Sequence, residues 1–137
     1  MGVEINLTYT GDLRVEAIHG PSGTRLITDA PVDNHGKGES FSPTDLVATA
    51  LGACLVTIMG IVAQKHNLDL TGTTCQVQKE MVSTPMRRIG RLAVTVNVPV
   101  KLSGDDQRRL ENAARNCPVH RSLHPSIESP IVFQWAR

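Results

Sequence analysis

The chain has 137 residues, of which 40% are hydrophobic and 20% are charged, as is typical of a soluble globular domain. Aromatic residues make up only 3%, which argues against a base-stacking surface for single-stranded nucleic acid. The formal net charge of +1 provides no field that attracts DNA or anionic lipid. We therefore expect one domain over residues 1–137 that binds neither nucleic acid nor membrane.

The cysteine content predicts a reducing compartment. Three cysteines are an odd number, and they are too widely spaced for the disulfide framework of a small secreted protein. Residues 3–9 alternate between apolar and polar side chains, whereas a secretory signal has a continuous apolar block. We expect the protein to be cytoplasmic.

The N-terminal third predicts an antiparallel meander of three strands. Residues 3–9 alternate strictly, residues 13–19 form a returning strand after a Gly-Asp turn, and residues 24–29 form a third strand after a second turn. Residues 30–41 are polar and rich in glycine. This segment is a loop that leads directly into the next element.

Residues 42–64 predict a long helix around which the chain is organised. Ser42 and Asp45 have the spacing of a capping box, and Pro43 suits the first helical position. No charged residue lies between Asp45 and Lys65, and apolar residues occur on every side of the helical wheel. Such a helix has to be buried on all faces, in protein or in lipid.

The uncharged segment 46–63 has eighteen residues, the lower limit for a membrane span. Two threonines and two glycines weaken its hydropathy, and no tryptophan or tyrosine flanks it. We therefore expect a core helix that a second subunit helps to cover.

The rest of the chain predicts an α+β domain with the order βββ-α-ββ-α-β. Cys117 falls on the apolar stripe of the second helix, and Pro118 interrupts that helix. The expected elements are two strands, a helix and a final strand, at 73–83, 91–100, 103–117 and 131–135.

Two cysteines, Cys54 and Cys117, lie on predicted buried helices, 63 positions apart. Spacing alone does not show that they meet, and a buried cysteine is often only a small hydrophobe. Cys75 lies in a predicted strand and has the same structural interpretation.

Two motifs resemble the OsmC/Ohr family of thiol-dependent peroxidases. They are Ser42-Pro43-Thr44-Asp45-Leu46, which leads to Ala53-Cys54, and Asn116-Cys117-Pro118-Val119-His120. The resemblance covers most of the chain. It implies an OsmC-like fold and an intertwined homodimer, with antiparallel sheets around the central helices. It also implies active sites built from both subunits, with no metal or organic cofactor.

The resemblance further implies a two-cysteine mechanism that removes peroxides in a stress response. Cys54 would be the peroxidatic cysteine, which attacks an organic hydroperoxide or hydrogen peroxide. Cys117 would be the resolving cysteine, which converts the Cys54 sulfenic acid into a disulfide. The reductant would be a dithiol, in some branches of the family a lipoyl group bound to a protein.

A thiol has to become a thiolate before it attacks a peroxide, and burial opposes this ionisation. In the family, an arginine from the N-terminal strands stabilises the thiolate and is held by a glutamate at the start of the helix. Arg14 is the candidate for this activator, and Arg25 competes with it. Thr44 occupies the position of the glutamate, which leaves Asp45 or Glu39 as the partner of the arginine. Asp45 also has the structural role of a cap.

His120 is a candidate pocket residue beside Cys117. Cys117, His120 and His124 have a spacing that weakly resembles a metal site. The second half of a zinc motif is missing, and two prolines shape the segment differently, so we expect no metal.

A non-enzymatic role on the same fold is the alternative. Loss of the glutamate at Thr44 favours a redox sensor, or a protein that binds a small hydrophobic ligand between helices and sheet. Turnover distinguishes these functions, because a sensor oxidises once and a binding protein ignores peroxide.

Overall fold

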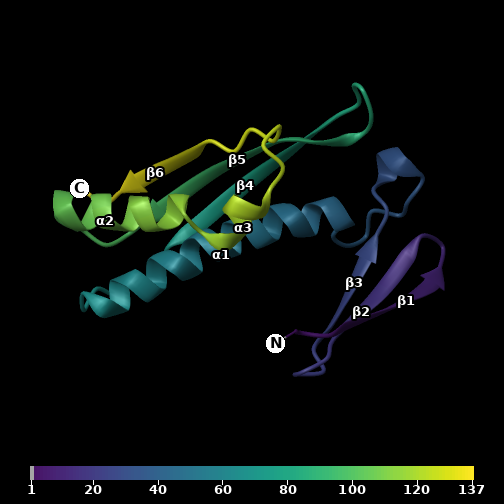
Figure 1. The fold of residues 1–137 in the computed structure, drawn as a ribbon, viewed down its shortest axis with the longest axis horizontal. Helices are drawn as coiled ribbons and strands as arrows, with labels where there is room; N and C mark the ends of the chain where they lie inside the picture. Colours follow the sequence, from purple (N-terminus) through teal and green to yellow (C-terminus); the bar gives the residue numbers. More distant parts are fainter. Residues whose placement is uncertain (1) are drawn as a thin grey trace. The chain divides into compact units, whose positions relative to one another are not determined.

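The computed structural model describes residues 2–137, which form an N-terminal and a C-terminal unit divided after Val47. The elements follow each other in the expected order of three strands, a long helix, two strands, a second helix and a last strand (Figure 1). A short helix after the second one is the only α-helix in the described residues beyond that order.

The N-terminal unit contains a three-stranded antiparallel meander, sheet A, which confirms the prediction from alternation. Its strands are β1 (Ile5–Gly11), β2 (Arg14–His19) and β3 (Arg25–Asp29), in the order β1-β2-β3. The following loop contains one 3-10 turn, η1 (Val32–Asn34).

One face of sheet A is apolar and uncovered in this chain. Leu7 and Leu26 both pair with Ala17, so their side chains share this face with the alternate residues of each strand. Ala17 is buried, whereas Leu7 remains 65% exposed and Tyr9 remains 64% exposed. Sheet A therefore lacks the packing layer that an apolar sheet face requires.

The turn between β1 and β2 has an unusual backbone. Asp12 and Leu13 both have positive φ angles, 54° and 62°. Two such residues suit the twist of a tight hairpin, but this conformation favours glycine, asparagine or aspartate. A leucine there is strained because its branched side chain crowds the backbone.

The long helix α1 (Pro43–Lys65) begins with the predicted capping box. The Ser42 N–H donates to Asp45 Oδ2 over 2.9 Å, and the Asp45 N–H donates to Ser42 Oγ over 3.1 Å. Two of the backbone N–H groups at the helix start are thereby satisfied.

The C-terminal unit contains sheet B, formed by β4 (Thr74–Val82), β5 (Arg88–Val98) and β6 (Ile131–Trp135). β4 pairs with β5 in the antiparallel direction, but β6 is parallel to β5. Sheet B is therefore mixed, and in this detail the expectation of antiparallel sheets was wrong. The reason is that α2 (Gly104–Arg115) and α3 (Pro118–Ser122) carry the chain back before β6 begins, as a parallel connection requires.

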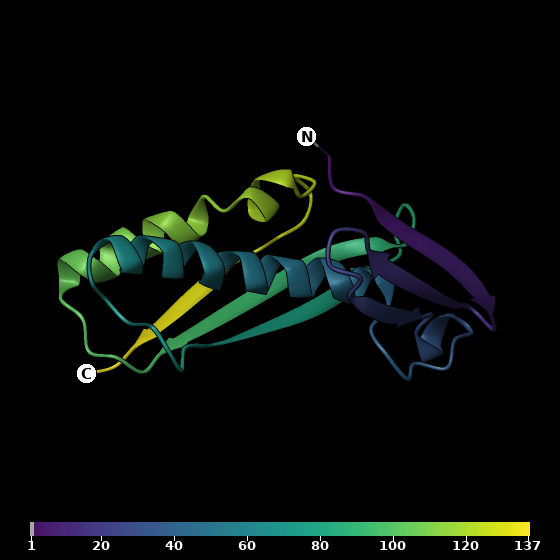
Figure 2. The ribbon, with the colours of Figure 1, turned by 90° about the horizontal axis from the view of Figure 1, so that it is seen from below.

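The core of the C-terminal unit lies between sheet B and the helices α1 and α2, which run along one face of the sheet (Figures 1 and 2). The alternating side chains of β5 face this core, as their spacing predicts. The fully buried side chains include Leu51, Leu55, Met59, Leu92, Val94, Val96 and Leu110.

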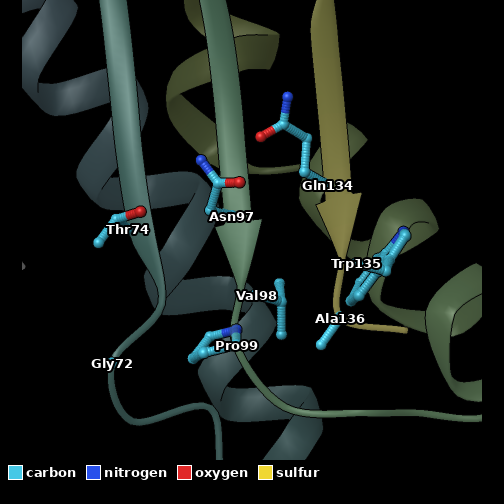
Figure 3. Close-up of a pocket in the computed structure, with 8 residues that line it drawn as sticks. All are labelled: Gly72, Thr74, Asn97, Val98, Pro99, Gln134, Trp135 and Ala136. Carbon is cyan, nitrogen blue, oxygen red and sulfur yellow. The ribbon is translucent and has the colours of Figure 1, made fainter.

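The opposite face of sheet B is polar. Thr74, Asn97 and Gln134 lie in one row across its three strands and border a shallow hollow of about 300 Å³ (Figure 3). The indole of Trp135, which also borders the hollow, donates its N–H to Glu111 of α2 over 2.9 Å. Among residues 2–137, those that line this hollow include no cysteine and no charged side chain.

The expectation that α1 is buried on all faces does not hold within one chain. Its buried residues follow one side of the helix, and Ile61 on the other side is 45% exposed. α1 has a mean hydropathy of 2.4 over an 18-residue window, enough for a membrane span by length and composition, and 33% of that window is buried. The core helix of a soluble protein can have the same length and composition. The buried residues are Ala48, Leu51, Gly52, Leu55, Met59 and Ala63.

Gly52 is the point at which α1 approaches β4 most tightly. A Cβ atom at Gly52 would lie 2.9 Å from Val77 Cγ2 and 3.2 Å from Cys75 Sγ. We predict that Gly52→Ala lowers the free energy of unfolding by about 1–2 kcal/mol, because overpacking outweighs the gain in helix propensity.

Urea denaturation of Gly52→Ala, Val77→Ala and the double variant checks this prediction. The double variant should lose less free energy of unfolding than the two single variants lose together. The reason is that the smaller side chain at position 77 relieves the clash. Additive effects would contradict the close contact.

Candidate thiol site

Cys54 and Cys117 lie next to one another in the C-terminal unit. Cys54 is half-buried in the middle of α1, and Cys117 is completely buried between α2 and α3. The Cys54 thiol is close enough to Cys117 to help raise the pKa of the Cys117 thiol. Both residues are free cysteines. The fold therefore brings together two thiols that are 63 positions apart in the sequence.

Cys117 owes its position to the proline that follows it. Pro118 ends the path of α2 and begins α3, so Cys117 takes an extended backbone conformation and becomes the N-cap of α3. Its Sγ accepts the N–H of His120 over 3.3 Å. Cys117 is buried as predicted, but it lies in the junction after α2 instead of within that helix.

The surroundings keep the Cys117 thiol protonated. Burial raises its pKa above the ordinary value, and the adjacent Cys54 adds to this effect. The backbone N–H groups of His120 and Val119 act in the opposite direction, because they stabilise a negative sulfur. Burial is the larger influence, so Cys117 is poorly suited to be the first thiolate.

His120 connects Cys117 to the segment before β6. Its ring Nε2 lies 2.9 Å from Ser129 Oγ, while its backbone N–H contacts the sulfur of Cys117. His124 has a different partner, Ser126, at 2.8 Å. Among residues 2–137, no three His, Cys, Asp or Glu side chains are grouped in a way that would hold a metal ion.

Cys75 lies apart from the thiol pair. Its sulfur contacts the sheet-facing side of α1 at Gly52, and burial raises the pKa of this thiol. Residues two positions apart on a helix point in nearly opposite directions, so Cys54 faces away from Cys75. Cys75 is therefore a packing residue of sheet B.

In the N-terminal unit, Arg14 is bound by a carboxylate that the sequence interpretation missed. Its Nε and Nη2 donate to the two oxygens of Asp29 over 2.7 and 2.9 Å. The side chain of Asp29 is 1% exposed, and Oδ2 also accepts the backbone N–H of Glu39 over 3.2 Å. The carboxylate of Glu39 lies 3.6 Å from Arg14 Nη2.

The contact between Arg14 and Asp29 favours the ionised form of both side chains. The bidentate hydrogen bond with Arg14 lowers the pKa of Asp29, although burial acts against it, and Asp29 in turn raises the pKa of Arg14. Arg14 and Asp29 are opposite one another in the β2–β3 register. A cross-strand pair of opposite charges was the signal in the sequence that could have revealed this contact.

The other candidates from the sequence have their own surroundings. Asp45 completes the capping box with Ser42, and its role as the partner of an arginine stays a prediction. Arg25, the competitor of Arg14, is exposed and pairs with Glu16 over 2.7 Å. Thr44 lies within hydrogen-bonding distance of the Ser42 hydroxyl, at 3.2 Å.

The fold and this geometry define a class of protein: an α+β domain with a free thiol on its central helix and a second thiol at a Cys-Pro helix start. The model of the OsmC-like protein family matches residues 36–131. The chain belongs to this family.

Solved structures agree with this assignment. A proposed osmotic stress induced and detoxification response protein from Psychrobacter arcticus is 45% identical, with a TM-score of 0.91 over 95% of this chain and 94% of that chain. An organic hydroperoxide resistance protein from Legionella pneumophila has a TM-score of 0.78 at 14% identity, covering 98% and 97% of the two chains. An organic hydroperoxide resistance protein from Bacillus subtilis has a TM-score of 0.69 at 16% identity, covering 98% of each chain.

The likeness to the Legionella and Bacillus proteins, at 14% and 16% identity, shows the fold alone. A search of curated proteins finds no match.

We predict that Asp29→Asn destabilises the protein at neutral pH, because it leaves Arg14 without its buried counter-charge. The folded pKa of Asp29 is lowered, so the ion pair adds stability above the unfolded pKa of about 3.9 and loses it as the pH falls through the folded value. Thermal unfolding should show a difference in melting temperature between wild type and variant that is smaller at pH 3 than at pH 7. Glu16→Gln, at an exposed pair, is the control and should have little effect.

Proposed function

We propose that the protein reduces organic hydroperoxides through Cys54 and Cys117, with Cys54 as the peroxidatic and Cys117 as the resolving cysteine. The observation that carries this proposal is that two free thiols, one on the central helix and one at the Cys-Pro helix start, lie near enough to influence one another. Membership of the OsmC-like family supports it, as do relatives named for organic hydroperoxide resistance.

The reaction has three steps. The Cys54 thiolate attacks the O–O bond, which gives the alcohol ROH and, after uptake of a proton, Cys54 sulfenic acid. The Cys117 sulfur then attacks the Cys54 sulfur, its proton leaves with the hydroxyl group as water, and a disulfide forms. An external dithiol transfers two electrons and two protons, restores both thiols and becomes a disulfide itself.

The environment of Cys117 supports this division of roles. Its raised pKa keeps it protonated while Cys54 reacts. Its burial protects it from direct attack by peroxide, while the N–H groups of His120 and Val119 stabilise negative charge that develops on its sulfur during resolution. In this proposal His120 shapes the pocket from the Cys117 side.

Arg14 is the proposed thiolate activator. Its charge is permanent, and the bidentate contact with Asp29 fixes the plane of its guanidinium group. Asp29 and Glu39 partly neutralise this charge, so the activation is expected to be weaker than that by an arginine without a counter-ion. Asp45 remains the second proposed partner.

The thiol mechanism predicts distinct products for each cysteine variant. One equivalent of cumene hydroperoxide should produce a Cys54–Cys117 disulfide in the wild-type protein, detected by non-reducing peptide mass spectrometry. Cys117→Ser should instead accumulate a sulfenic acid that dimedone traps at Cys54. Cys54→Ser should reduce peroxide no faster than buffer with a lipoyl dithiol as reductant.

Cys75→Ser is the matched control and should retain the wild-type rate. Intact Cys54 and Cys117 after treatment, or modification of Cys75 alone, would refute the two-cysteine mechanism. A single oxidation without turnover by any dithiol would support a redox sensor, which the threonine at position 44 favours over a fully activated enzyme.

We further propose that the protein is an intertwined homodimer. Two uncovered apolar surfaces support this: the face of sheet A that includes Leu7 and Tyr9, and the side of α1 that includes Ile61. A second copy of the same chain would supply the layer that each surface lacks.

A charge placed on either surface should produce monomers. Leu7→Lys and Ile61→Glu each bury a charge if the surfaces form the interface, so sedimentation velocity should show a smaller species than for the wild type. Thr8→Lys is the control, because Thr8 lies on the opposite face of β1. Dimers in both test variants would contradict this interface.

A further inference from the structure

The short helix α3 is attached to the segment before β6 by one side-chain hydrogen bond. His120 Nε2 lies 2.9 Å from Ser129 Oγ, and both residues are half-buried. Among residues 2–137, no other side chain of α3 forms a hydrogen bond or an ion pair outside that helix. A helix of five residues has little stability of its own, so this bond contributes directly to holding α3 in place.

Ser129 is a rigid anchor because the backbone on both sides of it is bonded to β5. The Glu128 N–H donates to the Gly90 carbonyl oxygen over 3.0 Å, and the Pro130 carbonyl oxygen accepts the Val94 N–H over 2.9 Å. A shift of Ser129 would break these backbone bonds. The bond between the two side chains therefore fixes α3 relative to sheet B.

His120 also contacts the Cys117 sulfur, but with its backbone. Its N–H donates to Cys117 Sγ over 3.3 Å, and the N–H groups of His120 and Val119 both stabilise negative charge on that sulfur. One residue thus reaches the segment before β6 with its ring and the thiol with its backbone. The place of the N–H donors depends on where the ring is anchored.

We propose that Ser129 and the His120 ring are positioning residues for the resolving thiol. Their hydrogen bond holds the N–H groups at the start of α3 against the Cys117 sulfur and so increases the fraction of thiolate that can attack Cys54 sulfenic acid. The inference rests on the proposed peroxidase function for the identity of this step. In the step, the S–S bond forms, the S–O bond of the sulfenic acid breaks, and the Cys117 proton leaves with the hydroxyl group as water.

Ser129→Ala removes the anchor and leaves both reacting cysteines in place. After rapid mixing with one equivalent of cumene hydroperoxide, Cys54 sulfenic acid should form at the wild-type rate. Its conversion to the disulfide should be about three- to tenfold slower, which is the effect of one lost hydrogen bond. Quenching with dimedone at successive times and mass spectrometry measure both rates. His120→Ala should slow the second step alike, and the double variant should be no slower, because the two side chains act as a unit.

Ser126→Ala is the matched control. Ser126 Oγ lies 2.8 Å from Nδ1 of His124, a bond of the same kind that lies beyond the end of α3 and holds no donor of the Cys117 sulfur. This variant should keep the wild-type rate of disulfide formation, and Ser129→Thr, which retains a hydroxyl, should restore most of it. Equal slowing in Ser129→Ala and Ser126→Ala would overturn the inference. Slowing of both chemical steps alike would also overturn it, because that result indicates a purely structural role.

A thiol titration separates this inference from the peroxidase reaction. In the full-length Cys54→Ser protein labelled with ¹³C at the cysteine Cβ, adding Ser129→Ala should raise the pKa of the Cys117 thiol, because the N–H donors that stabilise the thiolate are displaced. Cys75, packed against Gly52, is the internal control and should titrate unchanged. An unchanged Cys117 pKa would overturn the inference even if peroxide turnover is normal. A raised pKa in a protein that reduces no peroxide would support the positioning role and refute the proposed reaction.

Discussion

The close approach of α1 to β4 at Gly52 is the constraint on which the C-terminal unit depends. With no side chain at position 52, the helix backbone lies against Val77 and Cys75, and the rotation of the helix about its axis is fixed. Cys54, two residues further on, is then directed away from the sheet and toward the junction of α2 and α3. A glycine that has no chemistry of its own thereby determines which cysteine Cys54 meets.

Pro118 determines the position of the second thiol, Cys117. It interrupts the chain after α2, so Cys117 caps a new short helix and its sulfur receives the N–H of His120. The thiol is therefore buried among apolar groups and also contacted by a donor. These two influences oppose one another, and burial is the stronger. The balance of these influences favours the protonated form of the Cys117 thiol.

The sequence predicted the helices and strands well, but it predicted the contacts between them poorly. Alternation and capping signals located the strands and α1 to within a few residues, because both depend on local geometry. The parallel pairing of β6 was missed, since it depends on where α2 and α3 return the chain. The Cys54–Cys117 contact followed from family resemblance and not from spacing. Ser129, the partner of His120, carried no local signal because the contact joins two irregular segments.

The same limit explains why Asp29 was not predicted as a partner of Arg14. The resemblance directed attention to the start of the central helix, at Thr44, Asp45 and the loop residue Glu39. In this chain Asp29 binds Arg14 from the neighbouring strand, with shorter contacts than Glu39 makes. The N–H of Glu39 also binds the Asp29 carboxylate, so the pair ties the loop after β3 back to the sheet. A buried carboxylate on a strand is a more rigid support than a side chain at a helix end, because both oxygens and the backbone on either side of it are fixed. The orientation of Arg14 is therefore set within sheet A, by its two hydrogen bonds to Asp29.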